Sequence, residues 1–175
     1  MPKIIENVRE NILEEAQKQL HTNGYGKTTI RSIATACNIG VGTVYNYFSS
    51  KDALIAAFML EDWRACTEQM QAMNPADFDV FFTGVCVALK GFVDKYEYLF
   101  RDPDVATEFA GSFSERHRQL RERMATIVAP ALTDGSDAYS DDFLASYVVE
   151  SILYWVMTDA DMEDRLRALR RLAGK

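Results

Sequence analysis

The feature of this 175-residue chain that most limits its fold is a succession of apolar residues spaced three and four apart. The first run, Ile5, Val8, Ile12, Ala16 and Leu20, places its side chains on one face of a helix. Similar runs continue along the chain, separated by short segments with glycine, proline or asparagine. We therefore predict an all-α protein of about nine helices, without strands.

Composition agrees with a soluble globular protein, with 48% hydrophobic and 26% charged residues. No apolar run reaches the roughly 18–20 residues that a bilayer-spanning helix needs. The first ten residues lack the apolar segment of a signal peptide, so we expect a cytoplasmic protein. Cys37, Cys66 and Cys86 each lie in an apolar helical pattern, which predicts small buried hydrophobes and no disulfide, metal or cofactor.

Charge is distributed unevenly along the chain, whose net charge is −7. Residues 1–51 hold six Lys or Arg and four Glu, a net charge of +2, so the remainder carries −9. A mildly basic head on an acidic body suits a protein that touches an anion with one end only. An excess of +2 is small, and chance remains an alternative explanation.

Residues 28–48 read as two short helices joined by a tight turn. Thr28 or Thr29 can cap the first of them, and Asn38 tolerates the left-handed conformation that a turn requires. A second short helix follows within a few residues, which is the helix-turn-helix pattern. The apolar face of the first short helix is Ile30, Ile33, Ala34 and Cys37.

On a helical wheel, the second short helix has one buried and one exposed face. Val44 and Phe48 point one way and should anchor it, while Asn46 lies almost opposite. The other positions around Asn46 are Gly42, Thr43, Tyr45 and Tyr47.

That outer face has the chemistry of a helix that enters the major groove of DNA. Asn46 can pair with an adenine edge, and Thr43 can hydrogen-bond a base or touch a thymine methyl group. The hydroxyls of Tyr45 and Tyr47 can reach phosphates. The alternative is an ordinary surface helix with half-buried tyrosines, which is strongest for Tyr45 because it lies nearer the buried side.

A lysine opens the next helix. Ser49 and Asp52 have capping-box spacing, and Lys51 lies in the first turn, where the helix dipole disfavours a cation. A residue placed against local stability often has a functional reason, which here would be a phosphate contact. The alternative is a solvated lysine balanced by Asp52.

Residues 23–54 resemble the DNA-binding domain of the TetR family of bacterial transcriptional regulators. The shared features are the Gly-Tyr turn before two threonines, Gly42-Thr43, Tyr45, the Tyr47-Phe48 pair and Lys51-Asp52-x-Leu54. Two positions depart from the family pattern: Asn38 replaces a turn glycine, and Gly40 replaces a capping serine.

This resemblance implies a division of the chain into two domains. Residues 1–50 would form a three-helix DNA-binding domain, and residues 51–175 a helical domain for ligand binding and dimerisation. The implied function is a repressor that binds a palindromic operator as a homodimer and is released by a small hydrophobic effector. The predicted DNA-contacting residues are Thr28, Thr29, Arg31, Val41, Gly42, Thr43, Tyr45, Asn46, Tyr47 and Lys51.

The acidic body contains no motif of comparable strength. Between Phe81 and Val93 the only charged residue is Lys90, which predicts a helix nearly surrounded by others. A short helix is expected over 105–110, and the helix from residue 114 is expected to end near Pro130.

Large rings and polarizable side chains in the middle helices could be plain core, but the resemblance favours a ligand pocket. The residues predicted to line it are Trp63, Cys66, Met70, Phe82, Cys86, Phe109, Phe113, Tyr147 and Trp155.

The helix over 143–157 is apolar on two sides, so its second face would need a partner unless both faces are ordinary core. The residues predicted at the dimer interface are Phe143, Leu144, Tyr147, Val148, Ile152, Trp155, Leu166 and Leu169.

Other classes of function find less support. The segment 159–164 spaces carboxylates like a calcium loop but lacks the glycine at its sixth position. No Ser-His-Asp or Cys-His signature presents itself, and His21 and His117 lie far apart in sequence, so we do not expect an enzyme. The alternatives kept open are an all-helical enzyme or interaction module whose helix-turn-helix is only structural, and a DNA binder without a ligand.

Overall fold

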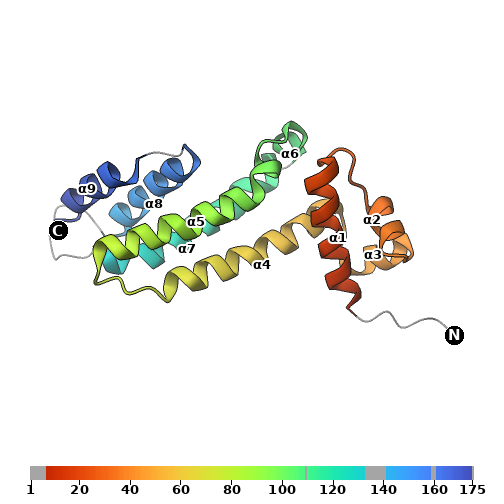
Figure 1. Ribbon diagram of the computed structural model, residues 1–175, viewed down its shortest axis with the longest axis horizontal. Coiled ribbons are helices and arrows are strands. Elements are labelled where there is room, and N and C mark those ends of the chain that lie inside the picture. The colour runs from red at the N-terminus through yellow and green to blue at the C-terminus, as the bar shows by residue number, and fades with distance from the viewer. Residues whose placement is uncertain (1–6, 109, 133–140, 159–160, 175) are drawn as a thin grey trace. The chain divides into compact units, whose positions relative to one another are not determined.

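The computed structural model describes residues 7–108, 110–132, 141–158 and 161–174, with the side chains of 106–108, 110–117 and 141 excepted. Nine helices and no strand occur in these residues, which confirms the all-α prediction there (Figure 1). In chain order they are α1 (Val8–Asn23), α2 (Ile30–Ala36), α3 (Val41–Tyr47), α4 (Lys51–Gln71), α5 (Phe78–Phe100), α6 (Pro103–Glu108), α7 (Ala110–Leu132), α8 (Asp141–Met157) and α9 (Met162–Leu172).

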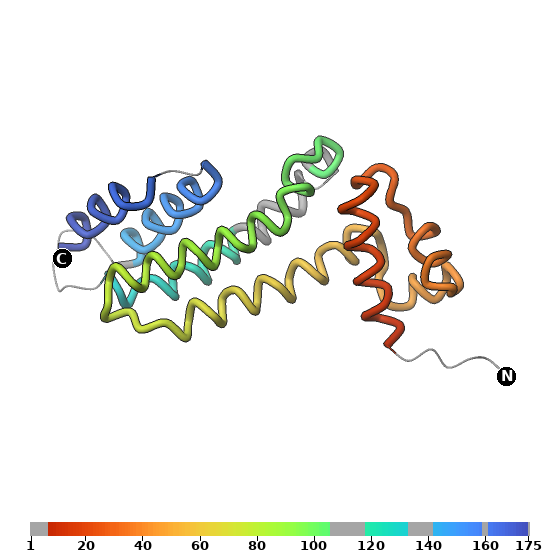
Figure 2. The backbone as a smooth tube through the Cα atoms, viewed as in Figure 1, coloured from red at the N-terminus to blue at the C-terminus, as the bar shows by residue number. Residues whose placement is uncertain are grey.

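The chain divides into two compact units. Unit 1 comprises residues 1–63 and 96–108, and unit 2 comprises residues 64–95 and 109–175. The long helices α4 and α5 therefore each contribute residues to both units. Figure 2 traces each of them as one continuous helix. These structural units do not test the predicted division into a DNA-binding domain (residues 1–50) and a ligand-binding and dimerisation domain (residues 51–175), which stays a prediction.

Unit 1 is built around the three N-terminal helices. One face of α1 is buried, and it carries apolar residues spaced four apart: Ile12, Ala16 and Leu20. α1 packs against α2, and α2 packs against α3. Further along, Phe58 of α4 stacks on Tyr96 of α5 with ring centroids 5.9 Å apart. The Tyr96 hydroxyl donates to the carboxylate of Asp62, and burial and this hydrogen bond both raise the pKa of Tyr96.

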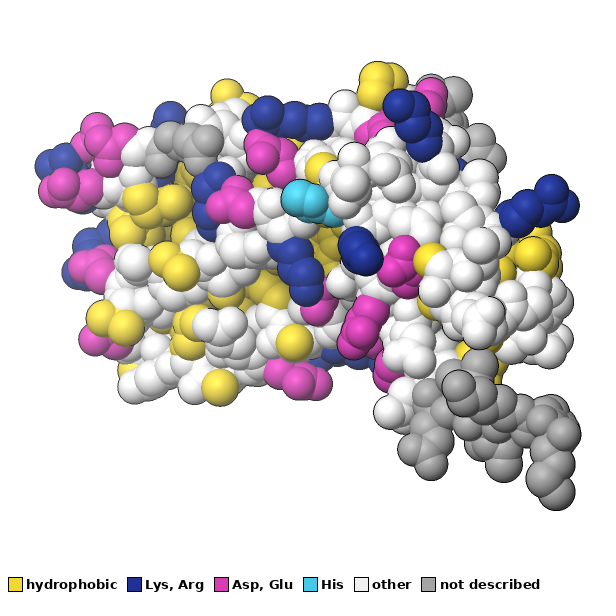
Figure 3. Space-filling model, turned by 45° about the vertical axis from the view of Figure 1, so that its right-hand side comes forward, with side chains coloured by type: hydrophobic (Ala, Val, Ile, Leu, Met, Phe, Trp, Pro, Cys, Tyr) yellow, Lys and Arg dark blue, Asp and Glu magenta, His cyan; other side chains and the backbone are white. Residues whose placement is uncertain are grey.

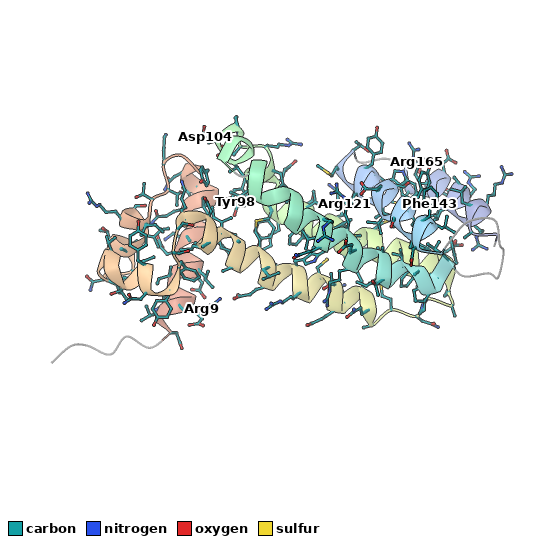
Figure 4. The ribbon with its side chains drawn as sticks, turned by 180° about the vertical axis from the view of Figure 1, so that it is seen from behind. Arg9, Tyr98, Asp104, Arg121, Phe143 and Arg165 are labelled. Atoms are coloured by element: carbon teal, nitrogen blue, oxygen red, sulfur yellow. The ribbon has the colours of Figure 1, made fainter. Side chains whose placement is uncertain are left out.

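Unit 2 is a second compact group of helices. α7 packs along α8, and the Arg121 guanidinium on α7 lies 2.6 Å from the Glu150 carboxylate on α8 (Figure 4). Phe78, Phe81 and Phe82 form an aromatic cluster at the start of α5. The α9 residue Arg170 joins α5 through an ion pair with Asp79, 2.6 Å long.

Several local predictions need correction. α5 is not surrounded within this chain, because Val80 and Val87 are 67% and 65% exposed. By contrast, α7 ends at Leu132, close to Pro130 as predicted. The short helix predicted over 105–110 lies at 103–108. Cys37 is only partly buried, whereas Cys66 and Cys86 are buried as expected.

In the described part of the chain, no helix combines the length and the apolar character that crossing a membrane would require.

Candidate nucleic-acid interface

The helix-turn-helix begins with a well-formed cap. Thr29 has an extended backbone, and its hydroxyl oxygen accepts the Ser32 backbone N–H at 3.0 Å. The Ser32 hydroxyl oxygen accepts the Thr29 N–H in return, also at 3.0 Å. Thr29 is thus the cap, and two otherwise unpaired N–H groups at the start of α2 are satisfied.

The turn between α2 and α3 has the backbone conformation that the sequence predicts. Asn38 adopts a left-handed conformation with φ 53°, which asparagine tolerates better than most residues. The Ile39 N–H then bonds the Ala34 carbonyl at 3.0 Å. Gly40 is the N-cap of α3 and offers no side-chain hydrogen bond, so that cap is missing as predicted.

α3 presents a polar and aromatic face on its outside. Val44 and Phe48 are buried, as the helical wheel predicts, and Asn46 is exposed on the opposite side. Tyr45 is 52% exposed, so packing alone does not account for it. A Cβ atom at Gly42 would meet nothing within 4 Å, which leaves this part of the face open to the close approach of another molecule.

The start of α4 differs from the prediction. Ser50, not Ser49, supplies the cap: its hydroxyl oxygen accepts the Ala53 N–H at 3.0 Å. Asp52 is engaged elsewhere, because its carboxylate accepts the hydroxyl of Tyr25 at 2.8 Å. The capping box predicted from Ser49 and Asp52 is therefore wrong, since the helix begins one residue later than that spacing requires.

Lys51 has a structural role that its sequence position does not reveal. Its ammonium group donates to the Tyr25 and Thr28 carbonyls, at 2.9 and 3.2 Å, and lies 3.4 Å from the centre of the Tyr25 ring. These contacts explain why a cation is tolerated in the first turn of α4. The side chain is half-buried, and the predicted phosphate contact stays a prediction.

Tyr25 is the residue that sequence reasoning missed. Its ring is buried, and its backbone N–H donates to the carboxylate of Asp102 at 3.1 Å. The loop that precedes α2 is therefore tied both to the start of α4 and to the turn between α5 and α6. An aromatic residue between two glycines was the only available signal, and it does not identify distant partners.

The electrostatics of this region favour contact with an anion. Residues 16–51 contain no aspartate or glutamate, in a chain whose net charge is −7. The same stretch contains four lysine or arginine residues: Lys18, Lys27, Arg31 and Lys51. A gap in the acidic residues was visible in the sequence and is a sharper signal than the small net charge of the N-terminal third.

For one residue, the predicted contact with DNA is wrong. Thr28 is fully buried, and its hydroxyl donates to the Gly24 carbonyl at 2.9 Å, so its side chain cannot reach DNA in this structure. Val41, Thr43 and Lys51 are partly exposed. The exposed members of the set are Thr29, Arg31, Gly42, Tyr45, Asn46 and Tyr47.

The predicted pocket residues are mostly side chains of the packed interior. Buried positions include Trp63, Cys66, Phe82 and Cys86, and burial raises the pKa of each of the two thiols to about 11. Phe109 and the side chain of Phe113 lie outside the described residues. Tyr147 is 52% exposed and faces solvent, which corrects its assignment to an enclosed pocket.

The two faces of α8 are distinct in the structure. Val148, Ile152 and Trp155 are buried in the core of unit 2, as is Leu169 of α9, so their assignment to a dimer interface is corrected. Leu144 and Leu166 are half-buried. The exposed face of α8 carries Phe143, Tyr147, Tyr154 and Met157. Phe143 is labelled in Figure 4.

Comparison with known proteins agrees with this arrangement. The profile of the family described as "Bacterial regulatory proteins, tetR family" matches residues 12–58. The HTH-type transcriptional regulator UidR of Escherichia coli K12 is 27% identical over 171 residues, covering 91% of this chain and 84% of that protein.

Solved structures share the fold over nearly the whole chain. A TetR-like transcriptional regulator from Rhodococcus sp. RHA1 has a TM-score of 0.62 and 21% identity, covering 99% of this chain and all of that one. FadR of Thermus thermophilus, a TetR-family repressor solved with lauroyl-CoA, has a TM-score of 0.58 and 19% identity, with coverage of 94% and 92%. With its helix-turn-helix and exposed α3 face, the chain carries the DNA-binding domain of the TetR family of bacterial transcriptional regulators at residues 12–58, and it is similar to such regulators over most of its length.

Proposed function

We propose that the protein represses transcription by binding a palindromic operator as a homodimer, and that a small hydrophobic effector releases it. Residues 1–50 would read the DNA, and residues 51–175 would bind the effector and hold the dimer together. Its place of action would be the cytoplasm, where bacterial DNA lies. UidR, which aligns over most of the chain, is also a transcriptional regulator, a class without enzymatic activity.

The observation that carries the DNA-binding part is the outer face of α3. Asn46, Tyr45 and Tyr47 are exposed there, Gly42 leaves room for close approach, and no acidic residue occurs between residues 16 and 51. A short, polar and uncharged helix face is suited to hydrogen bonding with base edges in the major groove. The neighbouring basic side chains and hydroxyl groups are suited to contacts with DNA phosphates.

The homodimer is supported by the exposed apolar face of α8. Four apolar residues of this one helix are each more than half exposed: Phe143, Tyr147, Tyr154 and Met157. Exposed apolar patches of this kind mark interaction sites. Two copies related by a two-fold axis would place two α3 helices on successive half-sites, about 34 Å apart on B-DNA.

The proposed effector is supported by analogy with a similar protein and by the continuity of helix α4. FadR of T. thermophilus binds lauroyl-CoA, and that observation concerns FadR alone. In this chain, α4 contributes to both units as one continuous helix, so a ligand that displaces its unit 2 end can alter its unit 1 end. For release, the ligand must bind the DNA-free conformation more tightly than the DNA-bound one.

The test is a footprint on the DNA that flanks the protein's own gene. We expect protection of a site with two-fold symmetry and a half-site spacing of about one helical turn. The matched control is the protein with Asn46→Ala and Thr43→Ala, which retains the fold and should lose the footprint. If the wild-type protein shows no sequence preference on genomic DNA, the proposal fails in favour of a structural helix-turn-helix in an enzyme or interaction module.

A further inference from the structure

The loop over residues 24–28, between α1 and α2, lies against the turn between α5 and α6. Gly24 has a φ of 77°, in the left-handed region that favours glycine. A Cβ atom at Gly24 would lie 3.7 Å from a carboxylate oxygen of Asp102, and one at Gly26 would lie 3.0 Å from a carboxylate oxygen of Asp104. The two aspartates and the loop all belong to unit 1. Figure 1 shows α6 beside the end of α1 from which the loop leaves.

Asp102 uses both of its carboxylate oxygens. Oδ1 accepts the Asp104 N–H at 2.9 Å and so caps the start of α6. Oδ2 accepts the Tyr25 N–H of the loop at 3.1 Å. The side chain is half-buried, and a hydrogen bond to a charged acceptor is stronger than one between neutral groups. A single carboxylate therefore joins the cap of α6 to the loop that precedes α2.

From this loop, short hydrogen bonds lead to the start of α2. The Thr28 hydroxyl donates to the Gly24 carbonyl at 2.9 Å, and the Thr28 N–H donates to the Tyr25 carbonyl at 3.2 Å. Thr28 is fully buried, and the next residue, Thr29, is the cap of α2. A displacement of the Tyr25 backbone would therefore move the end of α2 where Thr29 and Arg31 are predicted to contact DNA.

The charge of Asp102 has the wrong sign for a group that helps DNA binding. A carboxylate repels phosphates, and residues 16–51 contain no acidic residue at all. Electrostatics alone therefore predicts that removing this charge strengthens DNA binding. A role in holding the loop predicts the opposite, because the loop would lose an anchor. The sign of the effect distinguishes the two.

We propose that Asp102 is a positioning residue for DNA binding. Its carboxylate holds the backbone of Tyr25, and through it the start of α2, in the position that binds the operator. Because the same carboxylate caps α6, the cap of α6 and the position of the helix-turn-helix are coupled. The inference rests on the proposed binding of an operator, whereas the contact between Asp102 and Tyr25 does not.

Asp102→Ser separates the two contacts. Serine is as good an N-cap as aspartate, so α6 keeps its cap, but the side chain has no second acceptor oxygen for the Tyr25 N–H. We expect affinity for the operator to fall roughly tenfold, the effect of losing one hydrogen bond to a charged group. Asp102→Ala loses both contacts and should bind no more tightly than Asp102→Ser.

Glu97→Gln is the matched control. It changes the net charge by the same amount, near the end of α5, and removes only an exposed ion pair with Arg101, 2.6 Å long. Exposed ion pairs of this kind contribute little to stability. Glu97→Gln should therefore bind the operator as tightly as wild type or slightly more tightly. Fluorescence anisotropy with a labelled operator measures all four proteins in parallel.

Hydrogen exchange at two amides gives a readout that a purely structural role would not produce. Without DNA, the Tyr25 N–H should exchange roughly tenfold faster in Asp102→Ser than in wild type, and the Asp104 N–H should be unchanged. Coupling between two sites is reciprocal, so operator DNA should slow exchange at the Asp104 N–H in wild type. In Asp102→Ser, where the link to the loop is broken, operator DNA should not slow it.

The outcomes decide the proposal. It is overturned if Asp102→Ser binds the operator as tightly as Glu97→Gln, or if only Asp102→Ala binds weakly, because the cap of α6 would then be responsible. Exchange at Asp104 that operator DNA leaves unchanged in wild type also overturns it. A wild-type protein that binds no operator contradicts the proposed function as well, whereas equal Tyr25 exchange in wild type and Asp102→Ser contradicts this inference alone.

Discussion

Asn46 lies at the centre of the exposed face of α3, and its amide is the side chain on that face best suited to read a base. We predict that Asn46→Ala loses about 1–3 kcal/mol of binding free energy at the preferred operator and relaxes base preference. Titration of the operator and of scrambled DNA would measure both effects. Thr22→Ala, on the exposed side of α1, is the control and should leave both unchanged.

Lys51 combines a structural contact with a predicted phosphate contact, and the two can be separated. Lys51→Met removes the ammonium from the Tyr25 and Thr28 carbonyls, so we expect the free energy of unfolding to fall by about 1–3 kcal/mol. The slope of log affinity for DNA against log salt should also fall, by about one charge. Chemical denaturation measures the first effect, and binding at several salt concentrations measures the second.

Lys27→Met, at an exposed lysine of the loop that Lys51 contacts, is the matched control and should leave stability unchanged. An unaltered free energy of unfolding in Lys51→Met would contradict the structural role. An unaltered salt slope would leave the structural role intact and remove the phosphate contact.

At the scale of single elements, the structure moves the cap of α4 from Ser49 to Ser50. Ser50→Ala removes the oxygen that accepts the Ala53 N–H and should cost about 1 kcal/mol of stability. Ser49→Ala should cost much less, because that side chain is exposed and caps nothing. Thermal unfolding of the two variants in parallel decides between the two positions. Equal losses would show that the cap contributes nothing in solution.

At the scale of the whole molecule, α8 has one buried and one exposed apolar face, and the exposed one should form the dimer. On the face of the molecule that Figure 3 shows, hydrophobic side chains are interspersed with charged ones, so exposure alone does not identify an interface. Tyr154→Glu places a charge at a position that is 63% exposed, and it should convert the dimer to a monomer because a buried unpaired charge is costly.

Val87→Glu is the matched control for that prediction. Val87 on α5 is 65% exposed, nearly the same as Tyr154, but it lies on a different helix. Analytical ultracentrifugation should show a dimer for wild type and Val87→Glu and a monomer for Tyr154→Glu. A monomeric wild type at micromolar concentration, with DNA present, would contradict dimerisation through α8. The opposite result, in which only Val87→Glu dissociates, would move the interface to α5.

The sequence by itself determined the helices and the outer face of α3. Helical periodicity is a local property, so the spacing of Ile12, Ala16 and Leu20 predicts a buried face before any partner is known. The same holds for Asn38, whose left-handed conformation satisfies a turn only four residues long, and for the opposite orientation of Val44 and Asn46.

The tertiary structure alone decided which apolar faces are covered and which polar groups meet. Val148 and Tyr147 are neighbours on an apolar helix, yet one is buried and the other exposed, because packing against α7 covers one side only. Likewise, Tyr25 meets Lys51, Asp52 and Asp102 across 26 to 77 residues of chain. Such contacts depend on where whole helices lie, and local periodicity holds no information about that.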